Sequence, residues 1–178
     1  MRVGIPEQAI KLSHAIARFH IYQRDTNDCG PYCVAMVTNA LYGARFVHAE
    51  VLAEELSRRG FPERIPGWAT MPWGIVAQLR RLGLRARWRV GAPFSDVFAN
   101  LRQDLVTIVI EGEPLLFEGL KWRGWSHYKI LDTWEPDRGF GFVDPGASDA
   151  TGMTWQPLDV FRRQWVWMGK QLIEVWRA

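Results

Sequence analysis

The sequence has little cysteine, no long apolar run and no apolar leader segment. Two cysteines in 178 residues are too few for a disulfide scaffold. The apolar runs are far shorter than a membrane-spanning helix requires. The first residues, Met1–Glu7, lack the apolar core of a signal peptide. These absences argue against a disulfide-rich secreted protein and a membrane-spanning one, and we expect a cytoplasmic protein.

Metal ligands are also scarce around the cysteines. Cys29 and Cys33 would share one face of a helix, where a disulfide within a single turn is geometrically awkward. A zinc site would need two more ligands, and His48 is the only other histidine close downstream. We therefore expect neither a metal nor a cofactor, and we interpret Cys33 as a core residue.

Lysine is scarce too, so the net charge of +3 comes from 18 arginines against 4 lysines. The densest group comprises Arg80, Arg81, Arg85, Arg87 and Arg89. A basic patch of this kind can bind nucleic-acid phosphates. Its last three members alternate with Ala86 and Trp88, however, as on the outer face of a half-exposed strand. We therefore expect no nucleic-acid partner.

What the chain does contain is enough apolar material for a core. The hydrophobic share is 48%, which argues against disorder. No internal repeat or low-complexity segment interrupts the sequence. We expect one domain over residues 1–178, with residues 1–20 as an N-terminal extension or helix.

The predicted secondary structure has helices first and strands afterwards. Pro31 fits only the first turn of a helix, and Gly43 is a stop signal for it. The predicted helices are Pro6–Phe19, one from about Pro31 to Leu41, Val47–Arg59 with Val51, Leu52 and Leu56 on one face, one capped by Thr70 and ending before Gly83, and Pro157–Trp165. The predicted strands are Arg85–Val90, Leu105–Ile110, His127–Trp134, Phe140–Val143 and Gln171–Trp176, with Asp137-Arg138-Gly139 as a hairpin turn. This order indicates an α+β fold, with a helical lobe packed on a C-terminal antiparallel sheet.

The segment Asn27-Asp28-Cys29-Gly30-Pro31 places a thiol at a loop-to-helix junction. A cysteine becomes a nucleophile as the thiolate, and a helix start favours negative charge. A buried cysteine that only packs is the alternative. The polar and turn-forming neighbours favour an accessible position, so we interpret Cys29 as a candidate nucleophile.

His127 and Asp144 complete a possible nucleophile, base and orienter in chain order. We expect His127 at the start of a strand, after a glycine-containing loop, where sites are commonly built. Asp144-Pro145-Gly146 is a turn signature, and the hairpin would bring this turn near His127. Asp132 is the competing orienter, but it lies too far along the strand at about 3.3 Å per residue.

Three blocks of the chain resemble the papain-like cysteine peptidases of the bacteriocin-leader-processing type. They are Gln23 with Asp28-Cys29-Gly30-Pro31-Tyr32-Cys33, then His127-Tyr128, then Asp144-Pro145; Thr70-Met71-Pro72-Trp73-Gly74-Ile75 resembles the start of the family's next helix. That bacterial family cuts leader peptides after a double glycine, often as a domain fused to an ABC transporter. The chain has no transporter segment and resembles the stand-alone members.

The resemblance implies a papain-like fold and a peptide or protein substrate cut at small residues. It also implies that Gln23 donates its side-chain N–H to the oxyanion. Trp122 and Trp125 are candidates to wall the substrate cleft, and Asp28, an acid at the helix start, is a further candidate for substrate binding. An acyltransferase with the same triad and an inactive peptide-binding module remain as alternatives.

Overall fold

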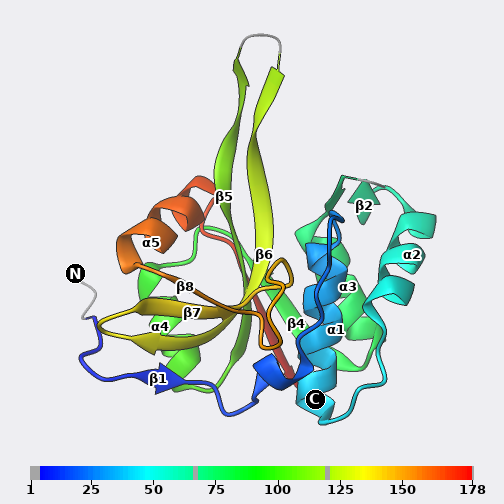
Figure 1. The fold of residues 1–178 in the computed structure, drawn as a ribbon. Coiled ribbons are helices and arrows are strands. Elements are labelled where there is room, and N and C mark those ends of the chain that lie inside the picture. Colours follow the sequence, from blue (N-terminus) through cyan, green and yellow to red (C-terminus); the bar gives the residue numbers. More distant parts are fainter. Residues whose placement is uncertain (1–4, 66–67, 119–120, 178) are drawn as a thin grey trace.

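The computed structural model describes residues 5–65, 68–118 and 121–177. It has a group of helices on one side and, on the other, a large antiparallel sheet against which further helices pack (Figure 1). The helices are η1 (Ile16–Phe19), α1 (Cys29–Tyr42), α2 (Ala49–Arg59), α3 (Pro72–Arg81), α4 (Phe94–Arg102) and α5 (Leu158–Trp167). The strands are β1 (Ile10–Lys11), β2 (Arg64–Ile65), β3 (Ala69–Thr70), β4 (Leu84–Arg89), β5 (Val106–Glu118), β6 (Lys121–Glu135), β7 (Gly139–Val143), β8 (Met153–Gln156) and β9 (Leu172–Arg177). The predicted α+β class is confirmed. None of the helices in the described ranges is long and apolar enough to cross a membrane.

The main sheet has the strand order β4-β9-β5-β6-β7-β8, and every pairing in it is antiparallel. Strands β5 and β6 continue beyond their neighbours as a long projecting hairpin (Figure 1). On β5, only the stretch Val106–Val109 pairs with β9. On β6, only the stretch Ile130–Glu135 pairs with β7. His127 therefore lies at the base of the projecting hairpin, where it is paired with Glu111 and beyond the end of β7.

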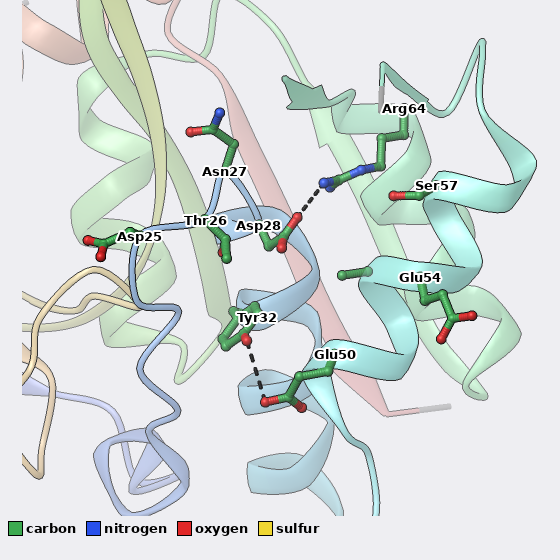
Figure 2. A pocket seen from close by; sticks show the side chains of 10 residues that line it. Asp25, Thr26, Asn27, Asp28, Tyr32, Glu50, Glu54, Ser57 and Arg64 are labelled. Atoms are coloured by element: carbon green, nitrogen blue, oxygen red, sulfur yellow. Dashed lines mark hydrogen bonds and ion pairs between the residues drawn. The ribbon is translucent and has the colours of Figure 1, made fainter. Parts of the chain in front are cut away.

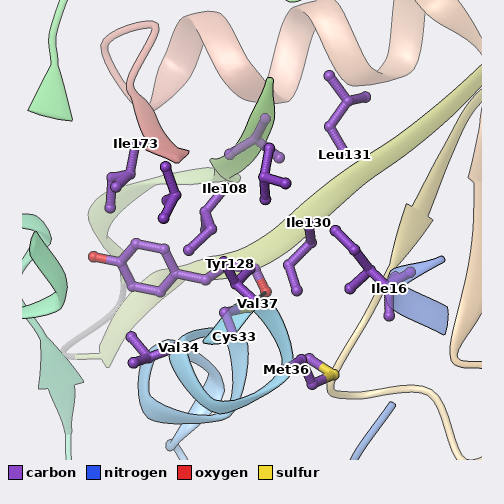
Figure 3. Packing of buried hydrophobic residues seen from close by; sticks show 14 of the residues in the cluster. Ile16, Cys33, Val34, Met36, Val37, Ile108, Tyr128, Ile130, Leu131 and Ile173 are labelled. Carbon is purple, nitrogen blue, oxygen red and sulfur yellow. Dashed lines mark hydrogen bonds between the residues drawn. The ribbon is translucent and has the colours of Figure 1, made fainter. Parts of the chain in front are cut away.

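Helix α1 is buried from Gly30 to Leu41 because it packs between the sheet and the helices α2 and α3. Figure 3 shows Cys33 and Val37 of α1 facing Tyr128 and Ile130 of β6. Cys33 is fully buried, and its thiol donates a hydrogen bond to the carbonyl of Tyr128 at 3.5 Å. The prediction that Cys33 is a core residue is confirmed.

A second cluster, of aromatic rings, covers the sheet where α4 and α5 pack. Trp134 lies 4.8 Å from Phe140 and 5.2 Å from Phe98, measured between ring centroids. Trp134 and Trp165 are buried here, whereas other described tryptophans are exposed on the surface, namely Trp68, Trp73, Trp125 and Trp167. The tryptophans are thus divided between the core and the surface.

The predicted helix Pro6–Phe19 is wrong. This segment instead forms β1 and the short helix η1. The reason lies in the tertiary structure. The pairing of β5 with β6 ends at Thr107 and Leu131, whereas β6 continues to Glu135. The exposed backbone of β6 is paired by β1, and unpaired buried backbone groups are costly.

The hairpin of β5 and β6 also differs from the expectation. β6 begins at Lys121 rather than at His127, so the stretch interpreted as a glycine-containing loop is strand. Helix α4 and strand β8 were not predicted. The helix α2 is confirmed, but Val51 is exposed while Ala53 joins its buried face.

Asp132 is a buried carboxylate that the fold does not compensate. It is 1% exposed, and neither carboxylate oxygen has a hydrogen-bond partner among the described residues. Burial raises the pKa of Asp132, against a smaller opposing effect of Lys11. The carboxylate form therefore lowers the free energy of unfolding. This loss of stability grows as the pH rises above the ordinary pKa of an aspartate.

We expect Asp132→Asn to raise the free energy of unfolding at pH 7 by about 1 kcal/mol, because it removes a buried unpaired charge. The gain should vanish at pH 3, where the wild-type side chain is protonated in both states. Thermal unfolding at the two pH values measures it, and Asp137→Asn in the exposed hairpin turn is the control. A lower stability of Asp132→Asn at pH 7 would contradict this account of the site.

Candidate functional site

Cys29 is the first residue of α1, and its side chain is partly exposed. Gly30 allows the close packing of this helix start: a Cβ there would lie 3.0 Å from Ile75 and 3.1 Å from Thr70. Pro31 follows in the first turn, where a missing N–H removes no helical hydrogen bond. The thiol is therefore held at a positively polarised helix end and remains accessible.

His127 joins Cys29 to Asp144. Its Nε2 lies 2.7 Å from Oδ1 of Asp144, and the side chain of Cys29 is close enough to raise the pKa of the same ring. With Nε2 engaged by the carboxylate, Nδ1 is the ring atom that remains for the thiol. The structure thus brings three of the sequence-predicted site residues into one connected group.

The charges of this group shift two pKa values in opposite directions. Burial alone would lower the pKa of His127, but the hydrogen bonds and negative charges of Asp144 and Cys29 outweigh it and raise the pKa to about 9. Burial alone would raise the pKa of Asp144, but His127, Lys129 and the Gly146 amide lower it to about 2. Both shifts favour the charged forms of His127 and Asp144 at neutral pH.

The turn after β7 holds the carboxylate of Asp144 in place. The Gly146 amide donates to Oδ1 at 2.7 Å, and Lys129 Nζ lies 3.2 Å from Oδ2. A Cβ on Gly146 would lie 3.1 Å from Oδ1 and 3.5 Å from Nε2 of His127, so glycine leaves room for the pair. Asp144 accordingly serves both as a turn residue and as the partner of His127. In the part of the chain that the structure describes, the competing Asp132 makes no such contact.

Gln23 lies in the chain segment that leads to Cys29, and it is buried. Its backbone N–H donates to the carbonyl of Pro145 at 2.8 Å, so this segment lies beside the Asp144 turn. Its Nε2 donates to the carbonyl of Thr26 at 2.8 Å, and the Thr26 hydroxyl donates back to the Gln23 carbonyl at 2.9 Å. The amide of Gln23 is therefore packed and oriented.

Asp28 has an ionic partner that sequence reasoning missed. Arg64 of β2 is 3% exposed and forms an ion pair with Asp28 and a 2.6 Å hydrogen bond to the Thr70 hydroxyl. Figure 2 shows the Asp28–Arg64 pair in a hollow that Tyr32 and Glu50 also line. Thr70 is thus not the cap of α3, whose N-cap is Met71. Arg64 offsets the negative charge that Asp28 would otherwise place beside the thiol.

A cleft of about 500 Å³ lies between the hairpin and the helical side of the molecule. Its lining includes Asn27, Trp68, Thr70, Met71, Trp125 and Tyr128. Trp125 therefore walls a cleft whose lining includes residues adjacent in sequence to Asp28 and His127. Asp28 lines the separate hollow instead, and the side chain of Trp122 lies outside the described residues.

Two further charged residues of the site were missed from the sequence, Lys129 and Glu111. Lys129 Nζ lies 2.7 Å from Oε1 of Glu111, and both side chains are nearly or fully buried. His127 and Lys129 are two residues apart on one strand, so their side chains lie on the same face of the sheet. This spacing is the signal that could have indicated Lys129. Glu111 gives no such signal, because its strand was expected to end at Ile110.

Comparison with known proteins identifies the fold. No protein-family model and no curated protein matches the chain. A solved structure described as a C39-like peptidase from Bacillus anthracis is similar over 96% of this chain and 98% of its own, with a TM-score of 0.70 and 15% identity. The peptidase domain of Streptococcus ComA, a bifunctional ABC transporter involved in quorum sensing, is similar over 90% of this chain and 99% of its own, with a TM-score of 0.61 and 22% identity.

A double glycine motif protease from an AMS/PCAT transporter, solved in complex with its leader peptide, is similar over 89% of this chain and 91% of its own. Its TM-score is 0.57 at 16% identity. These structures share one architecture, and the chain has it: the papain-like fold of the C39 peptidase domains. The fold implied by the sequence resemblance is confirmed.

We expect iodoacetamide to alkylate Cys29 faster than Cys33 at pH 7, by about tenfold or more, because the thiolate is the reacting form. Cys29 is accessible beside an imidazolium, whereas burial raises the pKa of Cys33 well above its usual range. Peptide mass spectrometry of the native protein measures both rates.

His127→Gln should slow the labelling of Cys29, because the imidazolium no longer stabilises the thiolate. His48→Gln changes an exposed histidine at the start of α2 and should leave the rate unchanged. Equal labelling of the two thiols in the wild-type protein would show that Cys29 is not activated.

Proposed function

We propose that the protein is a cysteine peptidase or amide hydrolase in which Cys29 is the nucleophile, His127 the acid and base, and Asp144 the orienter. The observation that carries this proposal is the position of His127, whose ring hydrogen-bonds to Asp144 at 2.7 Å and interacts with Cys29 at the start of α1. The C39 peptidase fold of the chain supports the same function. A nucleophile, a base and an orienting carboxylate are the parts that acyl transfer by a thiol requires.

We infer the first steps of the reaction from the charges of these groups. A His127 pKa of about 9 favours an imidazolium at neutral pH, and the imidazolium stabilises the Cys29 thiolate beside it. The thiolate attacks the carbonyl carbon, the C–N bond breaks, and the imidazolium donates its proton to the leaving amine. Water, deprotonated by the now neutral His127, then hydrolyses the thioester and restores the thiolate.

Gln23 is proposed to stabilise the oxyanion together with the backbone N–H of Cys29. The support is its position: Gln23 lies beside the Asp144 turn, and its amide is fixed by the bond to Thr26. The amide nitrogen carries two hydrogens, so one remains for a ligand after the first has bonded to Thr26. A donor that is oriented before the reaction needs no reorganisation when negative charge develops.

The proposed substrate is a peptide bound in the cleft that Trp125 walls. Trp68 and Trp125 are both exposed and line this cleft with apolar surface, which suits a peptide better than a small ion. The similar protease from the transporter is itself seen with a leader peptide. We propose small residues next to the cleaved bond on the basis of the sequence resemblance.

Gln23→Ala is expected to reduce turnover of a double-glycine leader peptide by roughly 10²–10³, the usual effect of deleting an oxyanion donor. Alkylation of Cys29 by iodoacetamide should stay within about twofold of wild type, because that reaction forms no oxyanion. Hydrolysis assayed by mass spectrometry, alongside the alkylation rate, separates the two effects.

Thr26→Val is the matched control for this variant. It removes the reciprocal hydrogen bond of the same turn but keeps the Gln23 amide, so turnover should remain near wild type. Full turnover by Gln23→Ala would overturn the oxyanion role. If Cys29→Ala and wild type bind the peptide equally and neither cleaves it, nor transfers it to an added amine, the chain is a binding module.

A further inference from the structure

Lys129 is a charged side chain within the site that the proposed mechanism does not use. It lies two residues after His127 on the same face of β6 and is 8% exposed. Its Nζ is placed between two carboxylates, 2.7 Å from Oε1 of Glu111 and 3.2 Å from Oδ2 of Asp144. Asp144 is therefore shared: Oδ1 contacts His127, and Oδ2 contacts Lys129.

The surroundings of Lys129 fix its position from several elements. Glu111 of β5 is fully buried, and Gln156 of β8 donates to its Oε1 at 3.1 Å. Phe142 of β7 presents its ring 5.8 Å from the ammonium. Among the described residues, the titratable groups that face Asp144 and His127 are Cys29 from α1, Lys129 from β6, and His20, whose ring lies 3.0 Å from the Asp144 carbonyl. Glu111 from β5 faces Lys129.

A buried ammonium and a buried carboxylate are costly to remove from water, and an apolar pair of similar volume is often as stable. The stability of the fold therefore does not by itself explain why Lys129 and Glu111 lie beside the imidazole. Its consequence is electrostatic. The charge of Lys129 offsets part of the negative charge of Asp144, so the carboxylate holds the imidazolium proton less tightly.

We propose that Lys129 is a positioning residue that fixes Oδ2 of Asp144 and lowers the proton affinity of His127, with Glu111 holding Lys129 in place. This inference rests on the proposed function, since it concerns how readily His127 gives its proton to the leaving amine. An aspartate without this second cation would stabilise the imidazolium more strongly and make it a weaker acid. With Lys129 beside it, the Asp144 carboxylate stabilises the His127 imidazolium less than an unpaired carboxylate would, and its effect becomes closer to that of an uncharged orienting side chain.

The test compares four proteins: the wild type, Lys129→Met, Glu111→Gln and the double variant Glu111→Gln/Lys129→Met. Lys129→Met has a similar length without the charge, and the double variant also removes the negative charge that Lys129→Met would leave buried and unpaired. The pKa of His127 is read by NMR titration of the ring in the full chain, with His127→Gln assigning the signal. Thermal unfolding establishes that each variant is folded.

Lys129→Met should raise the pKa of His127 by about one unit, both with Glu111 and with Gln at that position. Glu111→Gln alone should lower it, because Lys129 is then less neutralised and a nearby negative charge is gone. A structural role for the pair would lower the melting temperature without these opposite shifts. The inference is overturned if the His127 pKa in Glu111→Gln/Lys129→Met equals that in Glu111→Gln.

The two proposals fail separately in this experiment. The titration reports the electrostatic effect of Lys129 whether or not any peptide is cleaved. If the shifts occur but the wild-type protein cleaves no peptide, the electrostatic effect stands and the peptidase function fails. If peptide is cleaved and the shifts are absent, the function stands and the role of Lys129 fails. When both hold, the alkaline limb of kcat/KM should move with the His127 pKa.

Discussion

The packing of α1 against β6 is the constraint on which the candidate site depends. Cys33 lies one helical turn after Cys29, and Tyr128 directly follows His127. The Cys33 thiol contacts the Tyr128 carbonyl at 3.5 Å inside the core, so this buried contact fixes the distance between the helix start and the histidine. Tyr128 also donates to the carbonyl of Thr70 at 2.8 Å, which ties β3 to the same place. The apolar core therefore sets the geometry of the polar site beside it.

A second constraint comes from the register between β6 and β7. Ile130 pairs with Val143, so Asp144 follows at the level of Lys129 and reaches back to His127. An irregularity of the pairing between Leu131 and Thr133 lies just beyond this point. A shift of one residue would turn Asp144 to the other face of the sheet, because side chains alternate along a strand. The turn at Asp144 is therefore placed by the hairpin and not by its own sequence.

The charges around the site occur as compensating pairs. Arg64 pairs with Asp28 next to the thiol, and Lys129 links Asp144 to the buried Glu111. Each pair brings together residues from different elements, since an isolated buried charge would be costly. This arrangement keeps the carboxylates beside the helix start from opposing a thiolate at Cys29. Asp132 has no such ion pair among the described residues, and burial raises its pKa.

The sequence by itself determined the helix that begins at Cys29, the stop at Gly43 and the hairpin around Asp137. Those features depend on local rules, namely the fixed φ of proline, the freedom of glycine and the turn preference of short polar residues. It also indicated Cys29, His127 and Asp144 as a set, because the chemistry of a thiol nucleophile requires those residue types. Their contact is visible only in the fold.

Only the tertiary structure decided the strand at Ile10–Lys11, the length of the β5–β6 hairpin and the partners of the buried charges. β1 forms because the backbone of β6 is left unpaired by β5, a condition that no property of the first residues encodes. Arg64 and Glu111 carry no local signal of their roles, since each acquires its partner from a distant element. Local propensity acts over a few residues, whereas hydrogen-bond and charge compensation act across the folded chain, and that difference of range separates what was predictable here from what was not.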